Sequence, residues 1–147
     1  MNKEFIPLIM QNMAMLHWMT SRIKHDPEMF GYPRSQLRVV AQLYMIGRRT
    51  LKDISQSTEI SSSNLSVMLK DLETDGIVLR EPDDNDRRLV WYALTADGKK
   101  LGAKIVAEAQ NRISDLFNDI SAADEKKLTD ALIKMNEVLT KVKNSKE

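Results

Sequence analysis

The chain of 147 residues contains no cysteine, which excludes disulfides, thiolate zinc sites and cysteine-based redox chemistry. Histidine is scarce: His17 and His25 lie eight positions apart with no third ligand in view, so we expect neither a metal site nor a cofactor. No apolar run approaches the ~18 residues of a membrane span, and the N-terminus lacks the layout of a secretion signal. We therefore expect a cytoplasmic protein that does not enter a membrane.

A strong net charge is missing as well. The formal net charge is +1, and residues 48–100 hold nine lysines and arginines against ten aspartates and glutamates. If this region binds nucleic acid, the positions of its cations must carry the binding, because their sum does not. We expect no enzyme, since the sequence shows no nucleophile–base pair, no glycine-rich phosphate loop and no metal-ligand spacing.

Both ends of the chain have helical patterns. Residues 7–24 form a methionine-rich stretch with apolar side chains at helical spacing. Thr95 is placed to cap a long helix over 96–118, and residues 121–124 form a capping box before a last helix. The apolar residues of that last helix follow near-heptad spacing: Leu128, Leu132, Met135, Leu139 and Val142. One small head cannot cover both end helices, which indicates a homodimer.

The middle of the chain predicts three shorter helices. The first covers residues 34–46, and Thr50 with Asp53 forms a capping box for the second. The third follows the polar run 61–64 and ends at Gly76, a residue suited to a helix C-terminus. Its buried side is predicted from apolar residues at helical spacing: Leu65, Met68, Leu69 and Leu72.

A hairpin follows these helices. Two β-type runs, 77–79 and 89–94, flank a turn-rich stretch and predict a hairpin with a long loop. A helix–turn–helix followed directly by a hairpin is typical of a winged helix. We therefore predict a mainly α fold with a small β-hairpin wing, in which residues 33–96 form the winged helix-turn-helix head. Residues 1–32 and 97–147 are expected to supply the N- and C-terminal dimerisation helices.

Residues 50–102 resemble the MarR (multiple antibiotic resistance regulator) family. The family pattern has a hydroxyl-capped short helix and a recognition helix ending in leucine-x-x-x-glycine-hydrophobic-valine-x-arginine. It continues with a wing bearing aspartate-x-arginine and a leucine-threonine-x-x-glycine return. All four parts occur here in order, at residues 50–54, 69–80, 86–88 and 94–98.

The resemblance implies a DNA-binding transcriptional regulator that dimerises through the ends of the chain and binds a pseudo-palindromic operator. It also implies that many members lose DNA affinity when a small, often aromatic or phenolic, ligand binds between head and arm. We expect a repressor, because blocking a promoter needs only occupancy. The alternative is a winged-helix adapter that acts through protein–protein contacts, which the acidic balance of the head favours slightly.

A recognition helix places its N-terminal residues against base edges in the major groove, where short hydrogen-bonding side chains are useful. The candidates here are Ser61, Ser62, Ser63, Asn64, Ser66 and Lys70. Asn64 has the chemistry to pair bidentately with adenine, and Lys52 in the preceding helix adds a cation. The alternative is that the serines and Asn64 only cap the helix. Many family members carry a basic residue about where Val67 stands, which is a departure in this chain.

The predicted wing carries Asp86, Arg87 and Arg88. By the resemblance, Arg88 reaches the minor groove while Asp86 holds its guanidinium by a charge-assisted pair, and Arg87 reaches phosphate. The alternative is a solvated turn with a local ion pair. Asp83, Asp84 and Asp86 lie in the same loop and are compatible with a divalent-ion site, but a turn whose carboxylates bond their own backbone is the favoured interpretation.

A ligand site is a weaker prediction, on Met13, His17 and Tyr44. Methionine packs adaptably, and His17 and Tyr44 add ring bodies with polar tips, which suits an apolar pocket with few polar groups. The alternative is that the methionines form core and dimer contacts and that His17 is buried against a carbonyl.

Overall fold

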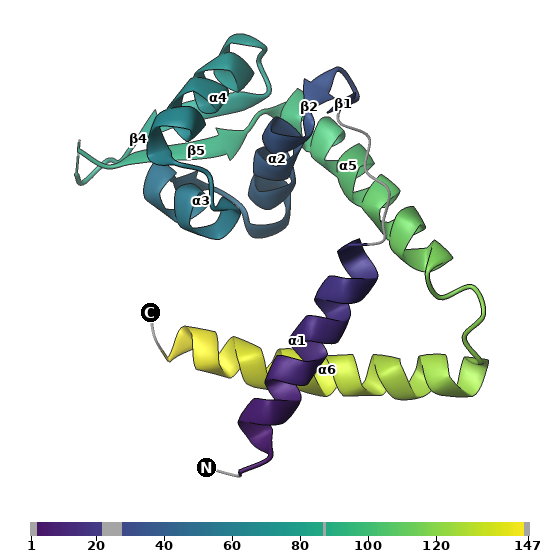
Figure 1. Ribbon diagram of the computed structural model, residues 1–147. Helices are drawn as coiled ribbons and strands as arrows, with labels where there is room; N and C mark the ends of the chain where they lie inside the picture. Colours follow the sequence, from purple (N-terminus) through teal and green to yellow (C-terminus); the bar gives the residue numbers. More distant parts are fainter. Residues whose placement is uncertain (1–2, 22–27, 87, 146–147) are drawn as a thin grey trace. The chain divides into compact units, whose positions relative to one another are not determined.

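The computed structural model describes residues 3–21, 28–86 and 88–145. Its contacts divide the chain into two compact units, Met1–Arg112 and Ile113–Glu147. The fold is mostly helical with a small three-stranded antiparallel sheet, so the predicted winged-helix class is confirmed (Figure 1). Within the described ranges, no helix is both long enough and apolar enough to cross a bilayer.

The helices closely follow the predicted ones, with their ends moved by a few residues. They are α1 (Phe5–Ser21), α2 (Arg34–Ile46), α3 (Leu51–Thr58), α4 (Ser62–Thr74), α5 (Ala96–Asp115) and α6 (Ala122–Asn144). The strands are β1 (Glu28–Met29), β2 (Tyr32–Pro33), β3 (Arg49–Thr50), β4 (Val78–Pro82) and β5 (Val90–Leu94). The pair β1–β2 and the strand β3 have no counterpart in the prediction, because two-residue strands are too short for a periodic pattern.

Side-chain hydrogen bonds hold α3 and the turn that follows it. The predicted capping box is confirmed: the hydroxyl of Thr50 accepts the backbone N–H of Asp53 at 3.2 Å, and the Asp53 carboxylate accepts the N–H of Thr50 at 3.3 Å. At the other end, Arg38 of α2 donates to the carbonyl of Thr58 at 2.8 Å. Ser55 donates to the carbonyl beyond the turn, that of Ile60, at 2.7 Å. These bonds satisfy one carbonyl at the end of α3, that of Thr58, and tie the helix to the residues that lead into α4.

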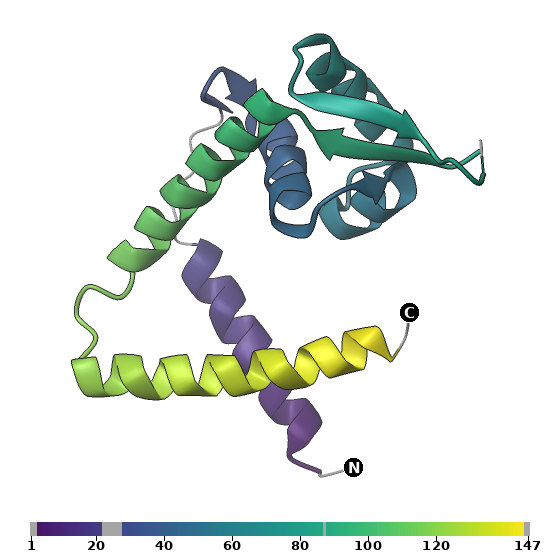
Figure 2. The same cartoon turned by 180° about the vertical axis from the view of Figure 1, so that it is seen from behind.

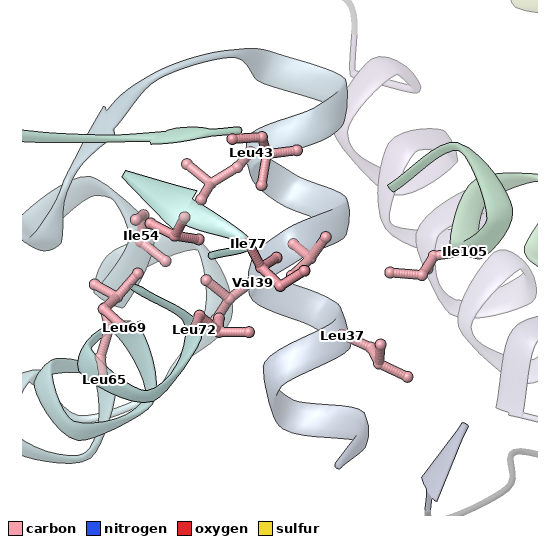
Figure 3. Packing of buried hydrophobic residues seen from close by; sticks show 12 residues of the cluster. Leu37, Val39, Leu43, Ile54, Leu65, Leu69, Leu72, Ile77 and Ile105 are labelled. Carbon is pink, nitrogen blue, oxygen red and sulfur yellow. The ribbon is translucent and has the colours of Figure 1, made fainter. Parts of the chain in front are cut away.

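The core of the first unit lies beneath α4. Leu65, Leu69 and Leu72 are buried on one side of that helix, as their spacing predicts, whereas Met68 of the same predicted stripe is only half-buried (Figure 3). They belong to one cluster with Val39 of α2 and Ile54 of α3. Because the three leucines share one stripe, they fix the rotation of α4 about its axis and turn the rest of its surface outward.

The sheet has the order β3-β5-β4, with all neighbours antiparallel. Arg80 pairs with Tyr92 and Glu81 with Trp91, which sets the register of the long hairpin. The hairpin extends beyond α3 and α4 in both views (Figures 1 and 2). The predicted wing is therefore present, and it is joined on its β5 side by the short strand β3.

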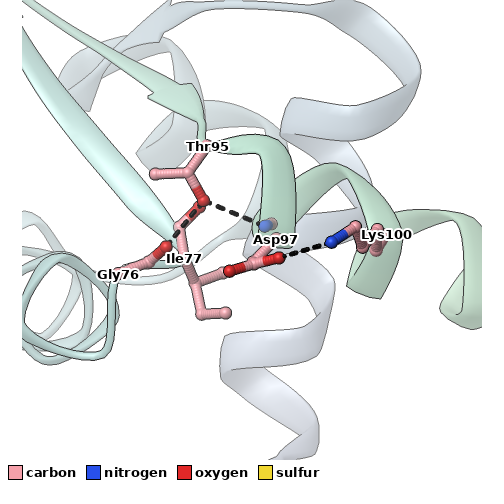
Figure 4. Close-up of polar contacts among 6 residues, drawn as sticks. Gly76, Ile77, Thr95, Asp97 and Lys100 are labelled. Carbon is pink, nitrogen blue, oxygen red and sulfur yellow. Dashed lines mark hydrogen bonds and ion pairs between the residues drawn. The ribbon is translucent and has the colours of Figure 1, made fainter.

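The return from the sheet into α5 is a dense junction (Figure 4). The hydroxyl of Thr95 donates to the carbonyl of Gly76 at 2.6 Å and accepts the backbone N–H of Gly98 at 3.0 Å, so it caps α5 as predicted. The backbone N–H of Thr95 donates to the carbonyl of Ile77 at 3.1 Å. A Cβ on Gly98 would overlap that same carbonyl oxygen. The leucine-threonine-x-x-glycine sequence is thus explained by packing: threonine bridges two elements, and glycine lets them touch.

The second unit is dominated by α6. Ser121 opens this helix, since its hydroxyl accepts the N–H of Asp124 at 3.1 Å and donates to the Asp124 carboxylate at 2.8 Å, as the capping box predicts. All described residues of α6 are exposed, including its large apolar side chains Leu128, Leu132, Ile133, Met135, Val138, Leu139 and Val142. The described residues of α1 are also unburied although the helix is apolar, with Met10 66% exposed. Both helices present apolar surface that folding of their own unit leaves uncovered.

The two compact units do not by themselves define functional domains. The two units are defined by contacts within the chain, and the boundary between them follows Arg112. The predicted boundaries at residues 32 and 96 instead separate the head from the segments expected to make dimer contacts. The assignment of residues 1–32 and 97–147 to dimerisation therefore stays a prediction.

Replacing Gly98 by alanine should lower the free energy of unfolding by about 2–3 kcal/mol, because the new methyl group must displace backbone. The clash must outweigh the gain in helix propensity, which Ala103→Gly at an exposed position of the same helix measures in the opposite direction. Urea denaturation followed by circular dichroism measures both variants, and a Gly98→Ala variant at least as stable as the unmodified protein would contradict the junction described above.

Candidate nucleic-acid interface

The N-terminus of α4 is capped by one serine. The hydroxyl of Ser61 accepts the backbone N–H of Asn64 at 3.4 Å and lies 3.3 Å from the hydroxyl of Ser63. This confirms that one residue of the polar run acts as the cap. Because Ser61 fills that role, the side chains of Ser62 and Ser66 are not needed for it, and within the described residues neither makes a hydrogen bond.

The surface of α4 outside the buried leucine stripe is continuous and exposed. We call it the outer face of α4, and it consists of Ser62, Ser63, Asn64, Ser66, Val67 and Lys70. Four of its members carry a hydroxyl or amide, and Lys70 supplies the one cation of the set. Such a surface can donate and accept hydrogen bonds along two helical turns, which is the chemistry that base edges in a major groove require.

The loop of the wing is shaped by its own carboxylates, as the favoured interpretation predicts. Asp83 Oδ1 accepts the backbone N–H groups of Asn85 at 2.9 Å and of Asp86 at 3.0 Å. Asp86 Oδ1 in turn accepts the backbone N–H of Arg88 at 3.0 Å. The expected pair between Asp86 and the Arg88 guanidinium is absent from the described ion pairs, because the two-residue spacing brings the carboxylate to the backbone instead. Arg88 is exposed, and Arg87 lies outside the described residues.

A tryptophan fastens this loop to the sheet. The indole N–H of Trp91 in β5 donates to Asp83 Oδ2 at 2.8 Å. The guanidinium carbon of Arg48 lies 4.8 Å from the centroid of a Trp91 ring, in cation–π range. The pKa of Asp83 is held below its ordinary value of 3.8, first by the Trp91 bond, then by the two backbone N–H groups, and also by the charge of Arg48.

Sequence analysis did not assign Trp91 a role. Trp91 and Asp83 are eight positions apart, and only the hairpin register brings the indole to the carboxylate. A tryptophan in a short strand after an aspartate-rich turn is the sole local signal. We name Arg48, Trp91 and Asp83 the wing anchor, since together they join the loop to the sheet.

Two further cations of the head, Lys52 and Arg80, are also accessible. Lys52 is exposed in the first turn of α3. Arg80 on β4 is exposed, and no ion pair within the described ranges includes it. The cations of this surface are therefore dispersed over α3, α4 and the wing rather than gathered in one patch.

The structure leaves the ligand prediction open. Met13 is 64% exposed on α1, and His17 is exposed on the same helix, which contradicts the alternative of a histidine buried within its own chain. Tyr44 packs against Gly102 of α5 and keeps 41% of its surface accessible. Among the described residues, no three histidines or acids group closely enough to hold a metal ion.

The comparison with protein families agrees with this geometry. Residues 30–89 match the model of the MarR family, and they include the helix–turn–helix and most of the wing. Over these residues the head is similar to the MarR family. The match covers the capping box of α3, the outer face of α4 and the wing anchor up to Asp83, so the likeness lies on the elements whose geometry is described above.

Individual relatives give the same result. The chain is 31% identical over 84 residues, or 57% of its length, to the uncharacterized HTH-type transcriptional regulator YwhA of Bacillus subtilis (strain 168). That alignment spans 60% of the relative's own length. A MarR family protein from Bacillus stearothermophilus has the same fold, with a TM-score of 0.68, 16% identity, and coverage of 95% of this chain and 99% of that one.

A further solved structure concerns regulation of DNA binding of Bordetella bronchiseptica BpsR by 6-hydroxynicotinic acid. It aligns with a TM-score of 0.53 and 21% identity, over 91% of this chain and 99% of that chain. At these identities the two structural comparisons establish the shared fold and nothing finer.

The wing anchor should loosen only in strong acid. Because the pKa of folded Asp83 is lowered, its contribution is complete above the ordinary value of 3.8 and is lost as the pH falls through the lower folded value. In a Trp18→Phe variant, the fluorescence of Trp91 reports this step, so its emission should stay constant down to pH 3.8 and change below it. Asp83→Asn keeps an acceptor without the titration and should remove the step; a transition centred above pH 3.8 would contradict the anchor.

Proposed function

We propose that this chain is a ligand-responsive transcriptional repressor that binds a pseudo-palindromic operator as a homodimer. The observation that carries the proposal is the outer face of α4, which a single capping serine leaves free to form hydrogen bonds. It supports entry of the N-terminal half of α4 into a major groove, with Asn64 and the serines toward base edges. The match of residues 30–89 to the MarR family supports the same conclusion.

The wing supplies the second contact in this proposal. Arg88 is exposed beside a turn that Asp83 and Asp86 shape, so its guanidinium is available to a minor groove next to the site of α4. Lys52 and Lys70 would contact phosphates, which position the protein but carry no sequence information. Since the head lacks an excess of cations, we expect modest affinity that falls steeply with salt.

Homodimerisation follows from the uncovered apolar surfaces of α1 and α6. Burying an apolar side chain is worth about 1.5–3 kcal/mol, so two helices lined with such residues strongly favour a partner. A second copy satisfies both at once, and a two-fold axis would place the two α4 helices about one DNA turn, ~34 Å, apart. Repression then needs only occupancy of the promoter.

Ligand response is proposed by analogy with BpsR, whose DNA binding is regulated by 6-hydroxynicotinic acid according to its structural description. Met13, His17 and Tyr44 remain the candidate residues, and a small aromatic or phenolic ligand the candidate class. The cytoplasmic location expected from the sequence rests on this proposal too, because a regulator works where its DNA is.

A protein-binding adapter is the second candidate function. It is favoured by the acidic residues of the wing, where Glu81, Asp83 and Asp84 line a recess together with Arg48. Binding to the chain's own promoter fragment that weakens as salt rises supports the regulator. Salt-independent binding, or none, supports the adapter.

Replacing Arg88 by alanine should weaken operator binding about tenfold and reduce the salt slope, because a groove contact and its released counterion are lost. Fluorescence anisotropy at fixed salt measures the effect. Lys99→Ala is the matched control, since it removes the same charge from an exposed position on α5. Equal affinities of the two variants would exclude Arg88 from the interface.

Charges on the apolar side of α6 should break the dimer. The double variant Leu132→Lys with Leu139→Lys is expected to sediment as a monomer at micromolar concentration, where the unmodified protein sediments as a dimer. Asp130→Lys places a lysine about 160° away around the helix and should leave the dimer intact. A monomeric unmodified protein would contradict the proposed dimer.

A further inference from the structure

Val67 occupies the middle of the outer face of α4. Its side chain is 62% exposed, whereas that of Leu65 two positions earlier is fully buried. Two residues correspond to about 200° of rotation, so Val67 points almost directly away from the core. Its helical neighbours on the same surface are Ser63 at i−4 and Lys70 at i+3, both exposed.

An isopropyl group is chemically out of place on this surface. The other members of the outer face all donate or accept hydrogen bonds, and valine does neither. A single exposed apolar side chain is ordinary on a protein surface, so the exposure of Val67 decides nothing by itself. What distinguishes it is position: it lies one helical turn after Asn64, at the centre of the surface proposed to face the bases.

The major groove offers one apolar group on its base edges, the C5-methyl of thymine. An aliphatic side chain that faces base edges therefore gains contact at thymine and at no other unmodified base. Valine is well suited to this contact because its χ1 angle has one strongly preferred value in a helix, so it loses little freedom on binding.

We propose that Val67 is a specificity-determining residue that contacts the C5-methyl group of one thymine in each operator half-site. The inference rests on the proposed function, and it names which base chemistry this recognition helix selects. Lys70, one turn further on, would contact phosphate and would not discriminate between bases.

The test compares thymine with deoxyuridine, which differ only by the methyl group. The operator is first located by footprinting with the full-length protein on its own upstream DNA. Each thymine of the protected duplex is then replaced in turn by deoxyuridine, and the dissociation constant is measured by anisotropy at fixed salt. One position in each half-site should weaken binding about fourfold, the value of one buried methyl group, and both together about fifteenfold.

Val67→Ala should abolish that deoxyuridine effect, so that both duplexes bind the variant within a factor of about 1.5. Alanine is a better helix former than valine, and the site is exposed, so the variant should fold. The matched control is Ser66→Ala, a change on the same surface that should keep the fourfold difference. Circular dichroism confirms that both variants retain the helices.

The outcomes distinguish a failure of the role proposed for Val67 from a failure of the proposed function. Salt-dependent operator binding without any deoxyuridine effect overturns the role of Val67 and leaves the regulator intact. The same holds if the Val67→Ala variant still distinguishes thymine from deoxyuridine. Absence of all salt-dependent DNA binding overturns the proposed function, and the inference falls with it.

Discussion

Three leucines on one side of α4 control which chemistry the protein presents. Leu65, Leu69 and Leu72 are at most 1% exposed, and each contributes about 1.5–3 kcal/mol of burial that a rotation of the helix would forfeit. Because they contact residues of both α2 and α3 within the same cluster, α4 has one favourable orientation. The outer face is therefore a consequence of the core: serine, asparagine, valine and lysine face solvent because the leucines do not.

The wing depends on a different set of forces. Its strands are short, and its loop has no apolar core of its own. Hydrogen bonds that the Asp83 carboxylate accepts from the backbone and from Trp91 take the place of that core, and Arg48, the residue before β3, stacks on the same Trp91. These groups are accessible to water, so each contact is weak, but together they limit the positions open to the loop. A short wing can in this way present Arg88 without a large buried foundation.

The head and the two uncovered helices differ in how they are stabilised. The head closes its core around α4 and seals the return to α5 at Thr95 and Gly98, although the end of α2 and Val67 keep exposed apolar side chains. In contrast, α1 and α6 carry apolar side chains that nothing in their own unit buries. An isolated helix is marginal in water, so such surfaces make the proposed second copy part of the fold rather than an addition to it. The distribution of apolar residues along the chain would then determine both properties: the leucines of α4 expose its outer face to DNA, and the apolar residues of α1 and α6 favour the second copy.

The amino-acid sequence alone determined those elements whose signals lie within a few residues of one another. The leucine stripe, the capping boxes at Thr50 and Ser121 and the helix over 34–46 were all predicted from local spacing, because helices are built from neighbours in the chain. Tertiary structure decided what depends on strand register: the pairing of Arg49 with Tyr92, the bond between Trp91 and Asp83, and the use of Asp86 for backbone rather than guanidinium. Register joins residues that the chain keeps as many as 43 positions apart, so no local pattern can specify it.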